Sequence, residues 1–214
     1  LGGSREDFSE DTSSFKVPCV IVTTSAENWS MEELSSVSID DEKAGETIVD
    51  YLIEYGHTKI AEIGANLELS QTAILRHNGY LNSLKKHGIT PDERYYERAR
   101  FSYDSAYRAM KKLLEKDIEI TAVYAISDVM AIGAIRAILD KGLRVPEDIS
   151  ITGFDGSTLA EYYNPKIVSI RQPHKDMAAR SVELLFNMID LHKGSCHEII
   201  PFELTEGKSV AGRI

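Results

Sequence analysis

Amphipathic helices and short apolar runs alternate along the middle of the chain. In several segments apolar residues recur every three or four positions, which is typical of one buried face of an α-helix. These segments are residues 41–55, a helix carrying Ile74 to Leu84, a helix carrying Ala106 to Leu114, residues 128–140 and residues 173–192. Gly56, Gly88 and Gly142 stand where three of them should end, because glycine readily adopts the left-handed conformation that closes a helix.

The segments between these helices are short and rich in apolar and β-branched residues, as buried strands are. They cover residues 59–65, 95–100, 120–126, 149–154 and 167–170. Strands that alternate with helices predict a parallel sheet covered on both faces and wound by right-handed crossovers. The expected fold class is therefore α/β with a doubly wound parallel sheet.

The two ends of the chain do not continue this repeat. Residues 18–22, 37–39 and 197–204 read as strands, and with the helix 173–192 they are too few to bury a lobe of their own. Leu1-Gly2-Gly3 resembles the end of a strand that began earlier. We therefore expect a strand–helix–strand unit of roughly 40–60 residues to precede this sequence.

Composition and charge narrow the possible partners. The chain has 214 residues, 43% of them hydrophobic, enough for one large domain or two small lobes. Its formal net charge is −10, so this chain is not expected to bind DNA, whose phosphates need a basic surface. No segment approaches the ~20 apolar residues of a membrane span, so we expect no membrane partner.

Metal, redox and catalytic motifs are absent from the sequence. Cys19 and Cys196 lie far apart in apolar surroundings, which favours two buried thiols over a disulfide. No His/Cys grouping has the spacing of a metal site, so we expect no metal. The sequence has no G-x-G-x-x-G, no P-loop and no G-x-S-x-G, and we expect neither a cofactor nor an enzymatic activity.

Polar residues follow the predicted strands at their carboxyl ends, where ligands bind to doubly wound sheets. They are Thr23, Phe101, Ser127, Asp155 and Gln172, with Thr72 and Arg76 early in the helix after the strand 59–65. Carboxylate, guanidinium, hydroxyl and amide groups bind sugar hydroxyls, and an aromatic ring packs on the apolar face of a pyranose. This set predicts a carbohydrate site rather than a site for a flat heterocycle.

Each of these residues also has a purely structural interpretation. Asp155 before Gly156 could form an Asx turn, and Ser127 could cap the helix that follows it. Phe101 could belong to the core, and Arg76 could be ordinary surface charge. The periodicity alone therefore indicates an α/β ligand-binding protein of unspecified role.

Four motifs resemble those of the LacI/GalR family of bacterial transcription regulators, in the family's order and spacing. They are Gly56-His57-Thr58-Lys59-Ile60-Ala61, Arg76-His77-Asn78-Gly79-Tyr80, Ser127-Asp128-Val129-Met130-Ala131-Ile132-Gly133, and Val145-Pro146-Glu147-Asp148-Ile149-Ser150-Ile151-Thr152-Gly153-Phe154-Asp155 followed by Gln172-Pro173. Together they span most of the chain.

The resemblance implies a two-lobed, periplasmic-binding-protein-like fold whose DNA-binding head is absent. One partial lobe would contain residues 1–39 and 173–201, and the other residues 40–172 and 202–214. The family's effector-contacting positions match Arg76, Thr72, Phe101, Ser127 and Asp155, with Thr23 and Gln172 as further candidates. Ser127 departs from the family, since many members have Asn there. Arg76 and Asp155 are expected in the cleft between lobes, with more effect on binding than on folding.

The resemblance also implies a homodimer, because regulators that read palindromic operators are two-fold symmetric. By analogy, the subunit contacts would involve the helix 128–140, through Ile132 and Ile135, and the aromatic pair Tyr162-Tyr163.

Two functions from different classes fit these observations. The first is the sensing core of a cytoplasmic repressor that binds a small carbohydrate and reaches operator DNA only through the missing head. The second is an extracytoplasmic solute-binding protein that delivers sugars to a transporter. The segments Val145–Ser150 and Met130–Gly133 favour the first function.

Overall fold

The computed structural model describes residues 17–27 and 33–213, so the predicted strand end at Leu1-Gly2-Gly3 lies outside the described residues. The chain divides into two compact units. Unit 1 comprises Leu1–Asp40, Leu69–Thr72 and Gln172–Phe202, and unit 2 comprises Asp41–Glu68, Ala73–Arg171 and Glu203–Ile214. Within the described part, no helix has the length and apolar character needed to cross a membrane.

Unit 2 is built on a six-stranded sheet with the order β4-β3-β5-β6-β7-β9. Its strands are β3 (Ile60–Gly64), β4 (Tyr96–Arg98), β5 (Ala122–Ala125), β6 (Ser150–Asp155), β7 (Val168–Arg171) and β9 (Glu203–Thr205). All neighbouring strands run parallel except β7 and β9, which are antiparallel. β3, β5 and most of β6 are buried, which explains why these strands read as continuous apolar runs.

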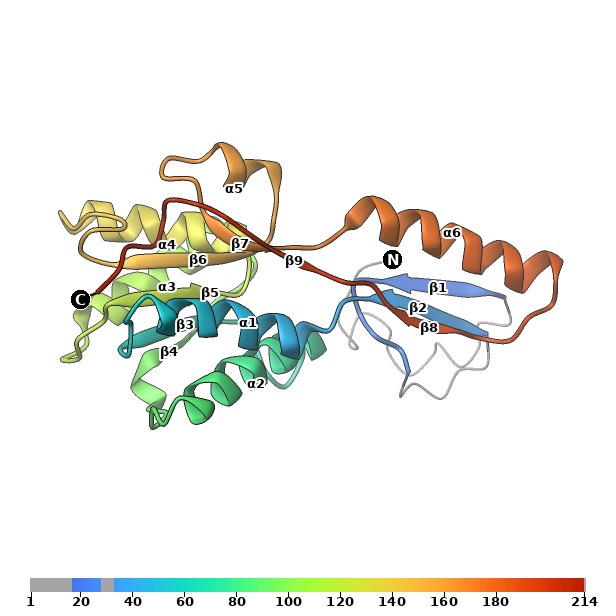
Figure 1. Cartoon of the computed structure of the whole chain (residues 1–214), viewed down its shortest axis with the longest axis horizontal. Helices are drawn as coiled ribbons and strands as arrows, with labels where there is room; N and C mark the ends of the chain where they lie inside the picture. Colours follow the sequence, from blue (N-terminus) through green and yellow to red (C-terminus); the bar gives the residue numbers. More distant parts are fainter. Residues whose placement is uncertain (1–16, 28–32, 214) are drawn as a thin grey trace. The chain divides into compact units, whose positions relative to one another are not determined.

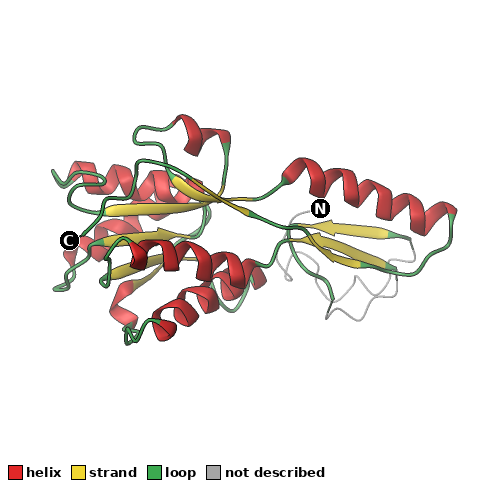
Figure 2. Cartoon of the chain, viewed as in Figure 1, coloured by secondary structure: helices red, strands yellow, loops and turns green. Residues whose placement is uncertain are grey.

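Helices cover both faces of this sheet (Figures 1 and 2). They are α1 (Asp41–Glu54), α2 (Gln71–Lys86), α3 (Tyr103–Glu115), α4 (Asp128–Asp140) and the short α5 (Thr158–Tyr162). Figure 1 shows α1 and α2 on one side of the sheet and α3 and α4 on the other. The strand order reverses at β4, as right-handed crossovers require when a chain winds both faces. The predicted α/β doubly wound sheet is confirmed.

Two glycines explain parts of the sequence motifs. A Cβ atom at Gly79 in α2 would collide with the backbone of Glu42 in α1. A Cβ atom at Gly133 in α4 would collide with the backbone of Tyr103 in α3. The glycines of the Arg-x-x-Gly-Tyr and Met-Ala-x-Gly motifs therefore allow each helix pair to pack closely.

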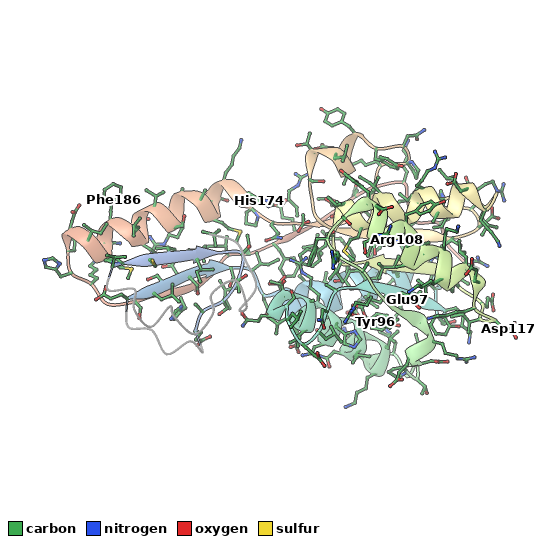
Figure 3. The ribbon with its side chains drawn as sticks, turned by 180° about the vertical axis from the view of Figure 1, so that it is seen from behind. Tyr96, Glu97, Arg108, Asp117, His174 and Phe186 are labelled. Atoms are coloured by element: carbon green, nitrogen blue, oxygen red, sulfur yellow. The ribbon has the colours of Figure 1, made fainter. Side chains whose placement is uncertain are left out.

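Unit 1 contains a three-stranded parallel sheet with the order β1-β2-β8. The strands are β1 (Cys19–Val22), β2 (Leu34–Ser38) and β8 (His197–Ile199), and α6 (His174–Asp190) packs on β1 and β2. Met177, Leu184 and Met188 form the buried stripe of α6. The opposite side of the helix exposes Phe186, which is labelled in Figure 3.

The single strand predicted at residues 197–204 is wrong. Its first part forms β8 in unit 1 and its last part forms β9 in unit 2. β2 is longer than the predicted strand 37–39, because the buried serines Ser35 and Ser36 belong to it. Ser35 Oγ accepts from the Cys196 amide at 3.0 Å, and Ser36 Oγ accepts from the Ala26 amide at 3.1 Å, so neither hydroxyl is buried without a partner.

Both cysteines are free thiols, but they are not both buried. Cys19 is half-buried, whereas Cys196 is exposed directly before β8, and the expectation of two buried thiols is wrong for Cys196. Apolar periodicity cannot distinguish the buried from the exposed side of so short an edge strand.

Candidate functional site

Arg76 is buried near the start of α2 and contacts three neighbouring elements. Its Nε donates to Asp41 Oδ1 at 2.7 Å, and its Nη1 donates to the backbone oxygen of Ile126 at 2.6 Å. The guanidinium lies 3.5 Å from the ring centroid of Phe154, in cation–π geometry. The surface-charge interpretation of Arg76 is therefore wrong: only 4% of the residue is exposed.

The Arg76 side chain is held as a fixed positive charge. Burial by itself would lower the pKa of its guanidinium, but the negative charges of Asp41 and Asp155 outweigh burial and raise that pKa above its usual value. Asp41 is the first residue of α1 and is itself buried. No sequence motif indicated the ion pair between Asp41 and Arg76, which lie 35 positions apart.

Asp155, the last residue of β6, lies beside Arg76. Its Oδ1 is 3.9 Å from Arg76 Nη1, and 32% of its side chain is exposed. Its φ of 104° is in the left-handed region, which costs a non-glycine residue conformational energy. In this strained conformation a partly exposed carboxylate lies next to a buried guanidinium, and strained residues of this kind cluster at binding sites.

The Asx-turn interpretation of Asp155 is not supported by the hydrogen bonds around it. An Asx turn would direct the Ser157 amide to the Asp155 carboxylate. That amide instead donates to Asp128 Oδ2 at 2.6 Å, while the Gly156 amide donates to Ser169 Oγ at 3.1 Å. The loop after β6 is thus held by other groups.

Asp128 is a site-positioning residue that the sequence interpretation missed. It is buried at the start of α4, and its Oδ1 accepts from Ser169 Oγ at 2.6 Å in addition to the Ser157 bond. Burial raises the pKa of its carboxyl group, although the hydrogen bonds from Ser169 and Ser157 lower it. Gly153 leaves room for this carboxylate, since a Cβ there would overlap it. Asp128 therefore holds the loop that directly follows Asp155.

Ser127 caps α4, as its structural interpretation predicted. Its Oγ accepts from the Met130 amide at 3.2 Å, and the side chain is almost entirely buried. A serine cap leaves the hydroxyl proton of Ser127 available as a donor.

Tyr124 is a further neighbour of Arg76 that no motif indicated. It is fully buried in β5, and its hydroxyl has no hydrogen-bond partner among the residues that the structure describes. Burial raises its pKa well above the ordinary value, although the charge of Arg76 acts in the opposite direction. No sequence pattern distinguishes Tyr124 from a core residue, because a tyrosine in an apolar strand usually belongs to the core.

Phe101 and the unit 1 candidates occupy different surroundings. Phe101 is 49% exposed just before α3, so the core interpretation is wrong for it. Thr23, at the end of β1, has a φ of 75°, a strained value for a β-branched residue. In unit 1, Thr72 shares a hydroxyl–hydroxyl hydrogen bond of 3.1 Å with Ser70, and Gln172 is buried just before α6.

The surface predicted for subunit contacts contains an apolar depression between α3 and α4. Its volume is about 390 Å³, and it is lined mainly by Tyr103, Tyr107, Ile132, Arg136 and Tyr163. Tyr162 is 82% exposed next to it in the chain. Ile135 is fully buried on the inner side of α4, so it cannot itself touch a second copy. That part of the prediction is corrected.

Within the described residues, no cluster of three or more His, Cys, Asp or Glu side chains has an arrangement that could hold a metal ion.

Comparisons with known proteins agree with this architecture. The model of the periplasmic binding protein-like domain family matches residues 49–210. The HTH-type transcriptional regulator MalR of Clostridium butyricum is 38% identical over 217 residues, covering 98% of this chain and 63% of MalR. The chain thus spans less than two thirds of that relative.

Two solved structures contain sugars. The transcriptional regulator CelR in complex with cellobiose superposes with a TM-score of 0.81 at 27% identity, covering 95% of this chain and 69% of CelR. A LacI family transcriptional regulator from Enterococcus faecium with bound ribose superposes with a TM-score of 0.82 at 26% identity, covering 92% of this chain and 72% of that one. The chain belongs to the periplasmic binding protein-like family, and within it to the effector-binding cores of LacI/GalR-type transcription regulators.

Proposed function

We propose that this chain is the carbohydrate-sensing, dimerising core of a bacterial transcription repressor. The observation that carries the proposal is the pair formed by the fixed guanidinium of Arg76 and the strained, partly exposed carboxylate of Asp155, 3.9 Å away. Similar regulators have been solved with cellobiose and with ribose. Their names describe transcription regulators, which favours a repressor over a transporter-linked solute-binding protein.

The chemistry of the pair suits vicinal hydroxyl groups. Asp155 accepts hydrogen bonds from two hydroxyls, while Arg76 donates to hydroxyl oxygens from a position that burial and Asp41 fix. The exposed ring of Phe101 supplies an apolar surface for one face of a pyranose. Ser127, Thr72, Thr23 and Gln172 remain candidates for further contacts.

Operator binding requires a separate element in this proposal. A chain with a net charge of −10 repels DNA phosphates, and its relative MalR is named as an HTH-type regulator. We therefore place operator recognition in a helix-turn-helix head outside this sequence, and the whole repressor in the cytoplasm with its DNA.

A thermal-shift screen tests the effector class. Neutral mono- and disaccharides, beginning with cellobiose and ribose, are compared with adenine and hypoxanthine at equal concentrations. A ligand present at roughly 100 times its dissociation constant stabilises the native state by about 2.7 kcal/mol, which is easily measured. We expect at least one sugar to raise Tm. Stabilisation by the nucleobases and by no sugar would overturn the proposal.

A further inference from the structure

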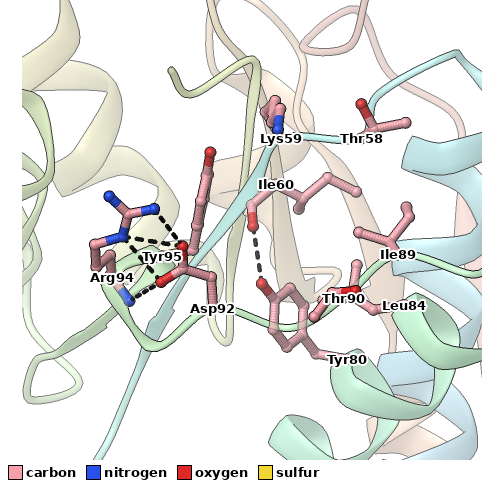
Figure 4. A pocket seen from close by; sticks show the side chains of 10 residues that line it. All are labelled: Thr58, Lys59, Ile60, Tyr80, Leu84, Ile89, Thr90, Asp92, Arg94 and Tyr95. Carbon is pink, nitrogen blue, oxygen red and sulfur yellow. Dashed lines mark hydrogen bonds and ion pairs between the residues drawn. The ribbon is translucent and has the colours of Figure 1, made fainter. Parts of the chain in front are cut away.

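A second pocket lies in unit 2, at the end of the sheet opposite to Arg76 and Asp155. It opens between the start of β3, the second half of α2 and the segment that leads to β4 (Figure 4), and its volume is about 270 Å³. Because the candidate effector residues follow the carboxyl ends of the strands, this pocket belongs to a separate site.

Part of the pocket wall is apolar, while polar atoms make up the larger share of the exposed lining. Ile60, Leu84 and Ile89 line it together with the rings of Tyr80 and Tyr95. The Tyr80 hydroxyl donates to the Ile60 carbonyl at 2.9 Å (Figure 4), and the Tyr95 hydroxyl donates to the Glu119 carbonyl at 2.8 Å. Both hydroxyls are thus directed at the backbone, and the rings can offer apolar surface to an occupant.

The rim of the pocket is polar and carries a net positive charge. Asp92 is already neutralised by Arg94, whose Nε and Nη2 approach its carboxylate at 2.9 and 2.6 Å (Figure 4). Lys59 lies on the same rim, and its ammonium group makes no ion pair or side-chain hydrogen bond within residues 17–27 and 33–213. A lysine without an acidic partner beside a partly apolar wall can pair with an anionic group of a ligand.

The size of the pocket limits the ligand to a single substituted ring. An apolar cavity of roughly 150 Å³ accommodates benzene, and drug-sized ligands need roughly 300–1,000 Å³. A volume of about 270 Å³ lies between these values. We propose that the pocket binds a small monocyclic aromatic carboxylate, with its ring against Tyr80, Leu84 and Ile89 and its carboxylate at Lys59.

Such a ligand would touch α2 one helical turn away from Arg76, since Tyr80 and Arg76 are separated by four residues on the same helix. All the residues of the pocket belong to this chain, so binding can be measured on the chain itself, without DNA and without a sugar.

NMR titration of the ¹⁵N-labelled chain tests the proposal with three probes: phenylacetate, its neutral analogue phenylacetamide, and acetate. We expect phenylacetate to bind with a dissociation constant of roughly millimolar magnitude and to shift the amide signals of Ile60, Leu84 and Ile89. Phenylacetamide should bind roughly tenfold more weakly, because it lacks the charge, and acetate should produce no saturable shifts.

Two variants and a matched control locate the site. Lys59→Gln should reduce the affinity for phenylacetate to that for phenylacetamide, and Ile89→Trp should abolish binding of both by filling the pocket. Lys85→Gln, at an exposed lysine of α2 outside the pocket, should bind phenylacetate like the parent chain. Absence of saturable shifts with phenylacetate, or the same affinity in Lys59→Gln as in Lys85→Gln, would overturn the proposal even if Ile89→Trp did not fold.

Discussion

At the scale of single residues, Glu62 and His77 form a close carboxyl–imidazole pair inside unit 2 that the proposed effector site does not use. His77 Nδ1 lies 2.6 Å from Glu62 Oε2, and Glu62 is completely buried in β3. Within the described residues, Glu62 Oε1 has no hydrogen-bond partner. The His77 ring is edge-on to Tyr96 and stacked near Tyr80, with centroid distances of 5.1 and 6.1 Å.

This pair should make the stability of the chain fall as the pH rises. Burial raises the pKa of Glu62, and although burial lowers the pKa of His77, its hydrogen bond to Glu62 raises it overall. A group whose pKa is higher in the folded state than in the unfolded state stabilises the fold at pH values below its unfolded-state pKa. That stabilisation is lost as the pH rises through its folded-state pKa. The loss should therefore begin above about pH 4.5 for Glu62 and above about pH 6.5 for His77.

The substitution Glu62→Gln removes the titrating carboxyl group but keeps a hydrogen-bonding side chain. Between about pH 5.5 and 8.5, we expect the unfolding free energy of the parent chain to fall by about 1 kcal/mol more than that of the variant. Urea unfolding at a series of pH values measures this difference. Glu54→Gln, at an exposed position of α1, should keep the parental pH dependence. A Glu62→Gln profile as steep as the parent's would contradict the expectation.

The sequence could predict some of the residues around the candidate site but not others. The motifs selected Arg76 and Asp155 as candidates from residue type and position alone. They missed Asp41, Asp128 and Tyr124, because an aspartate at a helix start reads as a cap and a tyrosine in a strand reads as core. Their partners are remote in sequence: Arg76 follows Asp41 by 35 positions, and Ser169 follows Asp128 by 41.

At the scale of elements, helix periodicity and glycine stops were reliable. Gly56, Gly88 and Gly142 each adopt a positive φ just after α1, α2 and α4. Strands were harder to predict where polar side chains are buried because they have hydrogen-bond partners. β2 has the sequence LSSVS, and it is buried because side-chain hydrogen bonds satisfy its serines. An alternating pattern does not indicate which sheet a strand joins, so the sequence could not predict the boundary between β8 and β9.

The outer surface of α4 is where we expect two copies to meet. An aspartate in place of Ile132 would put a charge in the apolar depression beside Tyr103, Tyr107 and Tyr163. Arg136, the cation in this depression, already pairs with Asp140 at 2.8 Å, so burying a further carboxylate there costs several kcal/mol. Ile132→Asp should therefore turn a dimer into a monomer at micromolar concentrations. Light scattering coupled to size exclusion measures the mass.

A matched control keeps this test specific. Ile74→Asp places the same charge at an exposed isoleucine of α2, on the opposite face of the sheet (Figure 1), and should leave the dimer intact. A parent chain that stays monomeric at high micromolar concentration would argue against the dimer itself. Dissociation by both variants would argue against α4 as the contact surface.

At the scale of the whole molecule, the candidate effector residues are divided between the two units. Arg76, Phe101, Ser127 and Asp155 belong to unit 2, and Thr23, Thr72 and Gln172 belong to unit 1. Sequence motifs place residues along the chain but do not say which of them also support the fold. Arg76 has both roles: truncating it would leave Asp41 buried without its partner, at a cost of about 3–5 kcal/mol. A loss of function in Arg76→Ala would therefore not separate binding from folding.

The substitution Asp155→Asn separates an effect on binding from an effect on folding. Asparagine has the shape of aspartate and tolerates a positive φ, so the backbone at the end of β6 should be preserved. The substitution weakens a partly exposed pair with Arg76 at 3.9 Å, and the unfolding free energy should change by less than about 1 kcal/mol. Asp117→Asn, at an exposed aspartate after α3 that is labelled in Figure 3, is the matched control.

For the sugar that most raises Tm in the screen, Asp155→Asn should weaken binding about ten- to hundredfold, because a charged acceptor contributes about 1.5–3 kcal/mol to its hydrogen bonds. Calorimetric titration measures this affinity. In a repressor assembled from this core and the proposed DNA-binding head, operator affinity without sugar should match that of the parent. The change in operator affinity on adding sugar, typically worth roughly 1–3 kcal/mol, should disappear at sugar concentrations that saturate only the parent. A normal response in the variant would show that Asp155 does not bind the effector, whatever its geometry beside Arg76.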